Sequence, residues 1–138
     1  MRTKVLFIYE DEGQYKIESI WASKVGKYYR IENIPFFIKN IALGDLVAVE
    51  SDGGVLYFDS LIESSGNSVV RLIIFNKNEV LRIGEELVKL GCGWEGSHLE
   101  NLISVNIPKN IPYSKIKIYL DKGESDKQWE YQEACLGQ

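Results

Sequence analysis

Two small groups of side chains in this sequence have the chemistry to hold a ligand or a partner. The first group combines hydroxyl, amide, guanidinium and imidazole groups and consists of Ser65, Asn67, Arg71 and His98. Ser65 and Asn67 belong to a run of Ser, Gly and Asn between two apolar segments, and such a run can form a nest of backbone N–H groups for an anion. Polar turns have the same composition, because these side chains bond to their own backbone. We expect a turn here, and a ligand pocket lined by the four residues is the alternative.

The second group combines aromatic anchors with carboxylates. It consists of Trp94, Glu95, Trp129, Glu130 and Glu133. This mixture is typical of a protein interface with a basic partner, in which buried aromatic side chains supply most of the affinity. The alternative is that both tryptophans pack between the two lobes of the fold.

The sequence contains no complete catalytic or metal-binding set. His98 is the single histidine, so one chain cannot supply an imidazole triad or a two-histidine metal site. A lone general base oriented by Glu95 or Glu100 remains conceivable, but a histidine beside Gly and Ser is typical of a solvated loop. Cys92 and Cys135 are too few for a disulfide framework or a zinc site. We therefore predict no catalytic residue, no metal and no cofactor, and a binding protein rather than an enzyme.

The charge of the chain argues against nucleic acid as a partner. The net charge is −4 and the isoelectric point is near 5.1, whereas nucleic-acid binding needs clustered Lys and Arg. The pairs Tyr28-Tyr29 and Phe36-Phe37 could stack on bases. Few basic residues accompany them, and aromatic residues on short strands usually pack in the core. A basic protein partner fits the charge better.

The first half of the chain predicts a small all-β lobe over residues 1–66. Segments of alternating or β-branched residues separated by turn residues cover 4–10, 15–21, 28–34, 42–50 and 55–62. Asp52, Gly53 and Gly54 favour a tight hairpin between the last two segments. Asp45 follows Gly44 at the start of a strand, where its carboxylate can accept backbone N–H bonds. We expect a strongly curved sheet or an SH3-like barrel.

The second half, residues 67–138, changes its hydrophobic period. Strands are predicted over 69–75, 93–98, 102–107 and 129–135. One helix is predicted from Val80 to Leu90, with Asn76 or Asn78 at its start and Gly91 as a left-handed cap. A second helical stripe begins at Tyr113 and ends before Gly123. The order β-α-β-β-α-β is that of a ferredoxin-like unit, so the predicted fold class is α+β.

The length of 138 residues suits one domain or two closely packed lobes. No apolar run approaches the ~18 residues needed to span a bilayer, and the N-terminus has no secretory signal pattern. We therefore expect a cytoplasmic protein without a membrane anchor.

The chain resembles the bacterial domain-of-unknown-function family numbered 4265 across nearly its whole length. The residues that carry the resemblance are Glu18, Trp21-Ala22, Tyr29-Arg30-Ile31, Asn33-Ile34-Pro35-Phe36-Phe37, Ala42-Leu43-Gly44-Asp45, Ser65-Gly66-Asn67-Ser68, Arg71, Leu90-Gly91-Cys92, Trp94-Glu95-Gly96-Ser97, Trp129-Glu130-Tyr131 and Glu133-Ala134-Cys135. The resemblance implies a shared fold and a bacterial origin. It transfers no catalytic role.

Two function classes follow. The leading hypothesis is an immunity protein that binds a bacterial toxin domain and occludes its basic groove through the acidic and aromatic residues named above. The competing hypothesis is a small-ligand-binding protein or enzyme that uses a pocket between the two lobes. The oligomeric state and the identity of any partner do not follow from the sequence.

Overall fold

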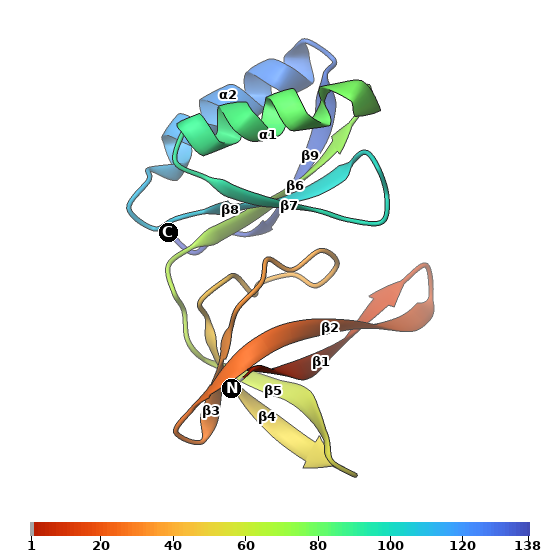
Figure 1. Cartoon of the computed structure of the whole chain (residues 1–138), viewed down its shortest axis with the longest axis vertical. Coiled ribbons are helices and arrows are strands. Elements are labelled where there is room, and N and C mark those ends of the chain that lie inside the picture. Colours follow the sequence, from red (N-terminus) through yellow and green to blue (C-terminus); the bar gives the residue numbers. More distant parts are fainter. Residues whose placement is uncertain (1) are drawn as a thin grey trace.

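The computed structural model describes residues 2–138 and shows a mixed α+β chain that is rich in strands and has two α-helices (Figure 1). A closed barrel lies at one end of the molecule, a four-stranded sheet lies next to it, and both helices cover the face of the sheet that points away from the barrel. The barrel and the helix-covered sheet therefore stack end to end.

Five consecutive strands form the barrel. They are β1 (Arg2–Asp11), β2 (Gln14–Val25), β3 (Tyr28–Ile31), β4 (Leu46–Asp52) and β5 (Val55–Glu63). Neighbouring strands pair antiparallel, and a short parallel pairing of β1 with β5 closes the barrel. Alternate residues point inward, so that Val5, Phe7 and Ile20 are buried in the barrel core.

The tight turns of the barrel lie where the turn residues predict them. Gly53 and Gly54 both have positive φ, and Asp52 pairs with Val55 across them, which is the two-residue hairpin expected from the sequence. Glu12 and Gly13, also with positive φ, join β1 to β2 in the same way.

The remaining elements form the sheet and its two covering helices. In chain order they are β6 (Ser68–Ile74), a 3₁₀ turn (Lys77–Glu79), α1 (Val80–Lys89), β7 (Gly93–Gly96), β8 (Leu102–Ile107), α2 (Tyr113–Ser125) and β9 (Trp129–Cys135). The strand order is β7-β8-β6-β9, and every neighbouring pair is antiparallel. The apolar face of α1 and the stripe of α2 pack on the sheet around Leu72, Ile103 and Val105.

The ends of α1 match the sequence prediction. Asn76 accepts a hydrogen bond from the backbone N–H of Asn78 at the start of the 3₁₀ turn that leads into the helix. Gly91, with φ of +99°, follows the C-cap Leu90 in the left-handed conformation that a helix end of this kind needs.

Several predicted boundaries are wrong. The strands expected over 15–21 and 93–98 are Gln14–Val25 and Gly93–Gly96. The strand expected over 28–34 ends at Ile31, and the one expected to begin at residue 42 begins at Leu46, because Pro35 has no N–H to donate and the carboxylate of Asp45 builds a turn with Ala42. Helix α2 continues past Gly123 to Ser125. The intervening segment, residues 32–45, has no regular secondary structure and lies between the barrel and the sheet.

Candidate functional site

The segment of residues 32–45 is held to the barrel by the carboxylate of Glu18 on β2. Its Oε2 atom accepts a hydrogen bond from the N–H of Phe36 at 2.7 Å, and its Oε1 atom accepts from Phe37 at 2.9 Å and Ile38 at 3.1 Å. Three successive N–H groups around one carboxylate form a tight anion nest, so Glu18 fixes the path of this segment.

A row of four polar side chains holds the same segment from the sheet. Glu95, Ser104, Arg71 and Gln132 lie in register across β7, β8, β6 and β9 on the face that points toward the barrel. Glu95 accepts from the N–H of Ile34 at 2.9 Å, and the Ser104 hydroxyl donates to the carbonyl of Pro35 at 2.6 Å. The barrel and the sheet are therefore joined through backbone groups of one segment.

Apolar contacts complete this junction over only half of the sheet face. Ile34 and Ala42 of the segment pack on Val69 and Ala134 of the sheet in a small separate core. The other half stays open, because Ile73, on the same face of β6, is 46% exposed. The uncovered half of the face becomes the floor of a cleft.

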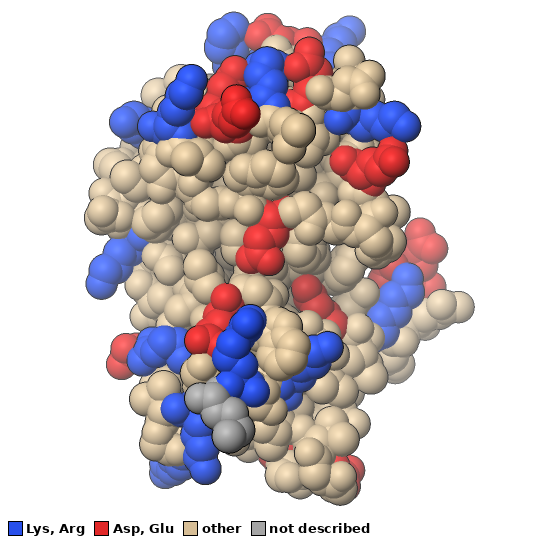
Figure 2. All heavy atoms as spheres, in the orientation of Figure 1, with Lys and Arg blue, Asp and Glu red and all other residues tan. Residues whose placement is uncertain are grey.

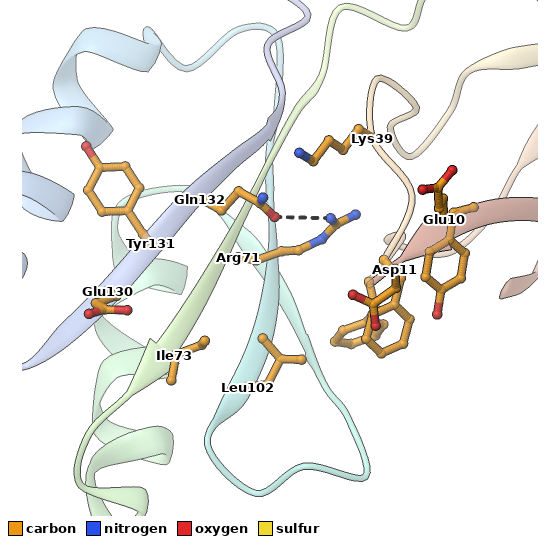
Figure 3. Close-up of a pocket in the computed structure, with 12 residues that line it drawn as sticks. Glu10, Asp11, Lys39, Arg71, Ile73, Leu102, Glu130, Tyr131 and Gln132 are labelled. Atoms are coloured by element: carbon orange, nitrogen blue, oxygen red, sulfur yellow. Dashed lines mark hydrogen bonds between the residues drawn. The ribbon is translucent and has the colours of Figure 1, made fainter. Parts of the chain in front are cut away.

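This cleft has a volume of about 480 Å³ and lies between the open sheet face and the end of the β1–β2 hairpin (Figure 3). Its lining comes from β1, the segment 32–45, β6, β8 and β9, and consists of Tyr9, Glu10, Asp11, Phe36, Phe37, Lys39, Arg71, Ile73, Leu102, Glu130, Tyr131 and Gln132. Clefts where two parts of a fold meet are the usual places for ligands.

Arg71 is the charged group at the floor of the cleft. Its side chain is 6% exposed; it donates to the carbonyl of Ile38 and, at 3.4 Å, to the amide oxygen of Gln132. Its Nε atom has no hydrogen-bond partner, and no carboxylate among residues 2–138 forms an ion pair with it. Burial lowers the pKa of the guanidinium to about 10, with Glu18 opposing the shift. Arg71 is therefore a buried positive charge at neutral pH with no carboxylate within ion-pair distance, and Glu18 is the acidic group whose charge acts on it.

Aromatic and apolar groups form the walls around this charge. The ring of Tyr9 stacks on the ring of Phe37, with centroids 5.7 Å apart and planes 7° apart. Leu102 and Ile73 lie on the sheet side, and Lys39 points toward the cleft above Arg71 (Figure 3). Such a site suits an anion that carries an apolar body, because the guanidinium takes the charge and the walls take the carbon skeleton.

Acidic residues stand at the rim of the cleft. Glu10 and Asp11 come from the end of β1, and Glu130 comes from β9 (Figure 3). Asp11 is already paired with Lys16, whose Nζ lies 2.8 Å from Asp11 Oδ2. The cleft therefore has carboxylates at its rim and the positive charge of Arg71 at its floor.

The polar run around Ser65 and Asn67 forms a turn, as expected. The Ser65 hydroxyl accepts from the N–H of Asn67, and Asn67 in turn bonds Leu43 and the N–H of Lys109. Asp45 accepts from the N–H groups of Ala42 and Ser65, which confirms its predicted backbone role. These groups satisfy one another and hold three loops together.

The pocket predicted from Ser65, Asn67, Arg71 and His98 does not form. Arg71 lines the cleft, but Ser65 and Asn67 lie in the turn described above. His98 is exposed on the connection between β7 and β8, where a solvated loop residue was expected. Of the four residues predicted to line a pocket, only Arg71 lines the observed cleft.

Trp94 and Trp129 each pack under a helix. Trp129 is 2% exposed, and its Nε1 donates to the carbonyl of Leu120. A Cβ at Gly123 of α2 would lie 1.9 Å from the Trp129 ring, and a Cβ at Gly84 of α1 would lie 2.3 Å from the Trp94 ring. The expectation that they pack between the lobes is wrong, and burial leaves Trp129 no surface for a partner.

The three carboxylates of the predicted interface are dispersed. Glu95 bonds the segment 32–45, while Glu133 points to the helix side and accepts a hydrogen bond from the hydroxyl of Tyr113. Glu130 is exposed at the rim of the cleft. Trp94, Glu95, Trp129, Glu130 and Glu133 therefore do not form one contact surface, because neighbouring residues of a strand point to opposite faces.

Several cleft residues were missed by the sequence reasoning. Tyr9, Phe37, Lys39 and Gln132 belong to three separate parts of the chain, and only the fold brings them together. One signal was present: β6 is a nearly continuous apolar strand interrupted by Arg71. A charged residue in a buried strand indicates either a partner charge or a ligand.

The sequence and the fold of this chain are similar to those of known proteins. A family model described as a domain of unknown function (DUF4265) matches residues 18–131. The chain belongs to this family. A crystal structure described as that of a hypothetical protein from Neisseria gonorrhoeae is similar to this chain, with a TM-score of 0.85 and 31% identity. The similarity covers 100% of this chain and 97% of that chain. A search of curated proteins finds no match.

The part of the chain matched by the DUF4265 model begins at Glu18 and includes the segment 32–45 and Arg71. Within residues 2–138 of this DUF4265 protein, no three His, Cys, Asp or Glu side chains come together to hold a metal ion. None of the helices in that part of the chain has the length and apolar character to cross a membrane.

Proposed function

We propose that this protein is a binding domain for a small anion with an apolar body, held in the cleft on Arg71. The observation that carries the proposal is the buried guanidinium whose Nε has no hydrogen-bond partner and which forms no ion pair with a carboxylate of residues 2–138. Leaving a charge buried without a partner is costly, and a protein keeps one where an incoming ligand supplies the opposite charge. A carboxylate is the simplest such group, because it accepts two parallel N–H bonds from an Arg side chain.

The surroundings of Arg71 support binding rather than chemistry. The residues that line the cleft include no His, Cys or Ser, so the usual nucleophiles and the most common general base are not at the ligand. The stacked rings of Tyr9 and Phe37 and the side chain of Leu102 offer apolar surface on both sides of the charge.

A matched pair of probes tests the proposal. The protein labelled with ¹⁵N is titrated with 3-phenylpropanoate and, separately, with 3-phenylpropanamide, and backbone and Arg Nε resonances are followed by NMR. We expect the carboxylate to give saturable shifts at Arg71, Ile73 and Leu102 and to bind about tenfold or more tightly than the neutral amide. Equal binding of the two probes, or shifts that avoid the cleft, would refute the proposal.

The finer fold assignment is also proposed here. We infer that residues 67–138 form a ferredoxin-like unit and that residues 1–66 form an SH3-like barrel. The strand order β7-β8-β6-β9, with the helices on one face, supports the first assignment, and the meandering order of β1 to β5 supports the second. An experimental structure with a different pairing of β6 would remove the ferredoxin-like assignment.

Binding of a protein partner, including occlusion of a toxin domain by a cytoplasmic immunity protein, is a second candidate function. One observation favours it: the outer face of the β1–β2 hairpin exposes Ile8, Tyr15, Ile17 and Trp21. On the face shown in Figure 2, acidic and basic side chains are mixed at both ends of the molecule, so this face offers no extended acidic surface to a basic partner. Loss of a co-purifying protein on Ile17→Asp, with unchanged folding, would support this candidate.

A further inference from the structure

We infer that the anion held at Arg71 is the carboxyl end of a polypeptide, bound as an extended strand along the free edge of β1. This inference rests on the proposed function and names its ligand. It is carried by three observations: an unpaired strand edge, a second cleft that continues the first, and the unpartnered charge at one end of both.

The edge of β1 is open over half of its length. All residues of β1 from Arg2 to Asp11 pair with β2 on one side. On the other side β5 pairs only with Val5 and Leu6. In an antiparallel ladder, alternate residues direct their N–H and C=O groups away from the partner strand. Residues 7–11 therefore present a row of backbone groups that another strand can pair with. Figure 1 shows this hairpin extending beyond the rest of the barrel.

A second cleft follows the same edge. It has a volume of about 340 Å³ and is lined by Phe7, Ile8, Tyr9, Glu10, Phe37, Ile38, Lys39, Ile41 and Phe58. Four consecutive residues of β1 line it, so the wall is the backbone edge itself. Four of its lining residues, Tyr9, Glu10, Phe37 and Lys39, also line the Arg71 cleft. The two clefts thus form one groove along β1.

The position of Arg71 sets the direction of the bound chain. The Arg71 cleft adjoins Tyr9 to Asp11, and the second cleft adjoins Phe7 to Glu10. A peptide whose carboxylate reaches Arg71 therefore runs parallel to β1, with its earlier residues in the second cleft. At about 3.3 Å per residue, the five residues of free edge accommodate a segment of about five residues.

The floor of the groove defines the side chains that such a peptide would carry. Phe58 of β5 stacks on Phe7, with centroids 4.7 Å apart, and both residues line the second cleft together with Ile41. Because side chains alternate along a strand, every second residue of the peptide would meet this apolar floor. The remaining ones would point to solvent, beside Lys39 and the acidic rim.

A peptide uses the groove more fully than a small molecule does. A compact anion would fill the Arg71 cleft but leave the backbone groups of residues 7–11 and the second cleft unused. Strand addition supplies main-chain hydrogen bonds along the edge, and capture of a terminal carboxylate fixes the register. Arg71 then sets where the chain must end.

The test uses pentapeptide pools with four randomised positions, sorted into twenty pools by their last residue. Each pool is prepared with a free carboxylate and, as its control, with a terminal amide. Binding is measured by fluorescence polarisation to the wild-type protein, to Arg71→Met and to Arg30→Met. Arg30 is a matched control, because its guanidinium also bonds a backbone carbonyl, that of Gly44, but does not line the groove.

We expect at least one free-acid pool to bind about tenfold or more tightly than both its amide and 3-phenylpropanoate. Arg71→Met should abolish that preference, and Arg30→Met should keep it. N-methylation of alternate peptide nitrogens in the best pool should weaken binding by about tenfold or more. Pools that bind no more tightly than 3-phenylpropanoate would overturn the peptide inference and leave the proposed function intact. Failure of the peptides and of 3-phenylpropanoate together would overturn both.

Discussion

Glu18 of the barrel and Arg71 of the sheet hold opposite ends of the same residue, Ile38. Glu18 Oε1 accepts the N–H of Ile38 at 3.1 Å, and Arg71 donates to the carbonyl of Ile38. The side chain of Ile38 is buried in the barrel core. One residue thus fixes the distance between the barrel and the floor of the cleft, so the shape of the site depends on both charged side chains.

Glu18→Gln should lower the free energy of unfolding by about 2–4 kcal/mol, because one carboxylate that accepts three backbone N–H bonds is replaced by an amide with a single acceptor. Urea unfolding measures the change. Glu63→Gln, at the exposed end of β5, is the control and should stay within about 0.5 kcal/mol of the wild type. Equal effects of the two substitutions would show that Glu18 does not anchor the segment 32–45.

Gly123→Ala should destabilise the protein although alanine favours helices. The helix gains about 1 kcal/mol from alanine, but the new Cβ would lie 1.9 Å from the Trp129 ring and force it to move. We expect a net loss of roughly 2 kcal/mol or more in thermal or urea unfolding. Gly93→Ala is the control, since nothing lies within 4 Å of its Cβ position. A Gly123→Ala protein as stable as the wild type would refute the packing described for Trp129.

Stability should fall between about pH 9 and pH 11 because of the two thiols. Burial raises the pKa of Cys92 from 9.0 to about 11, and burial followed by the charge of Asp45 raises the pKa of Cys135 from 9.0 to about 11. The unfolded chain loses these protons first, so their contribution is fully present below pH 9 and is lost as the pH rises through 11. Urea unfolding across this window should show a smaller fall in the Cys92→Ala, Cys135→Ala double variant. An equal fall in stability in the wild type and the double variant would contradict the role of the two thiols.

Arg71→Met should change stability little while removing ligand binding. The variant loses charged hydrogen bonds to Ile38 and Gln132, but it no longer buries an unpaired charge, and the two effects offset each other to within about 1 kcal/mol. Chemical unfolding checks the balance. A loss of roughly 3 kcal/mol or more would mean that Arg71 is kept for folding and would weaken the case for a ligand.

The elements of this fold could be predicted because their signals are local. The glycines at 53, 54 and 91 need positive φ, and the apolar residues of α1 repeat at the helical period. The resemblance to the DUF4265 family was also available from motifs along the chain and is confirmed by the family model.

The site could not be predicted because its contacts are not local. Glu18 and Arg71 are far apart in the sequence and meet at Ile38 only after the barrel stacks on the sheet. The aromatic and acidic residues around Trp129 were grouped as one partner surface, with packing of the tryptophans between the lobes as the alternative, but strand alternation places Trp129 and Glu130 on opposite faces. The glycine at 123 was the missing signal, because it makes room for the tryptophan inside a helix.

The measurement that tests the central claim most directly is calorimetric titration of 3-phenylpropanoate into the wild type, Arg71→Met and Arg30→Met. The account predicts saturable binding to the wild type and to Arg30→Met, and a loss of about tenfold or more in Arg71→Met. Unchanged affinity in Arg71→Met would contradict the claim that the buried guanidinium holds the ligand.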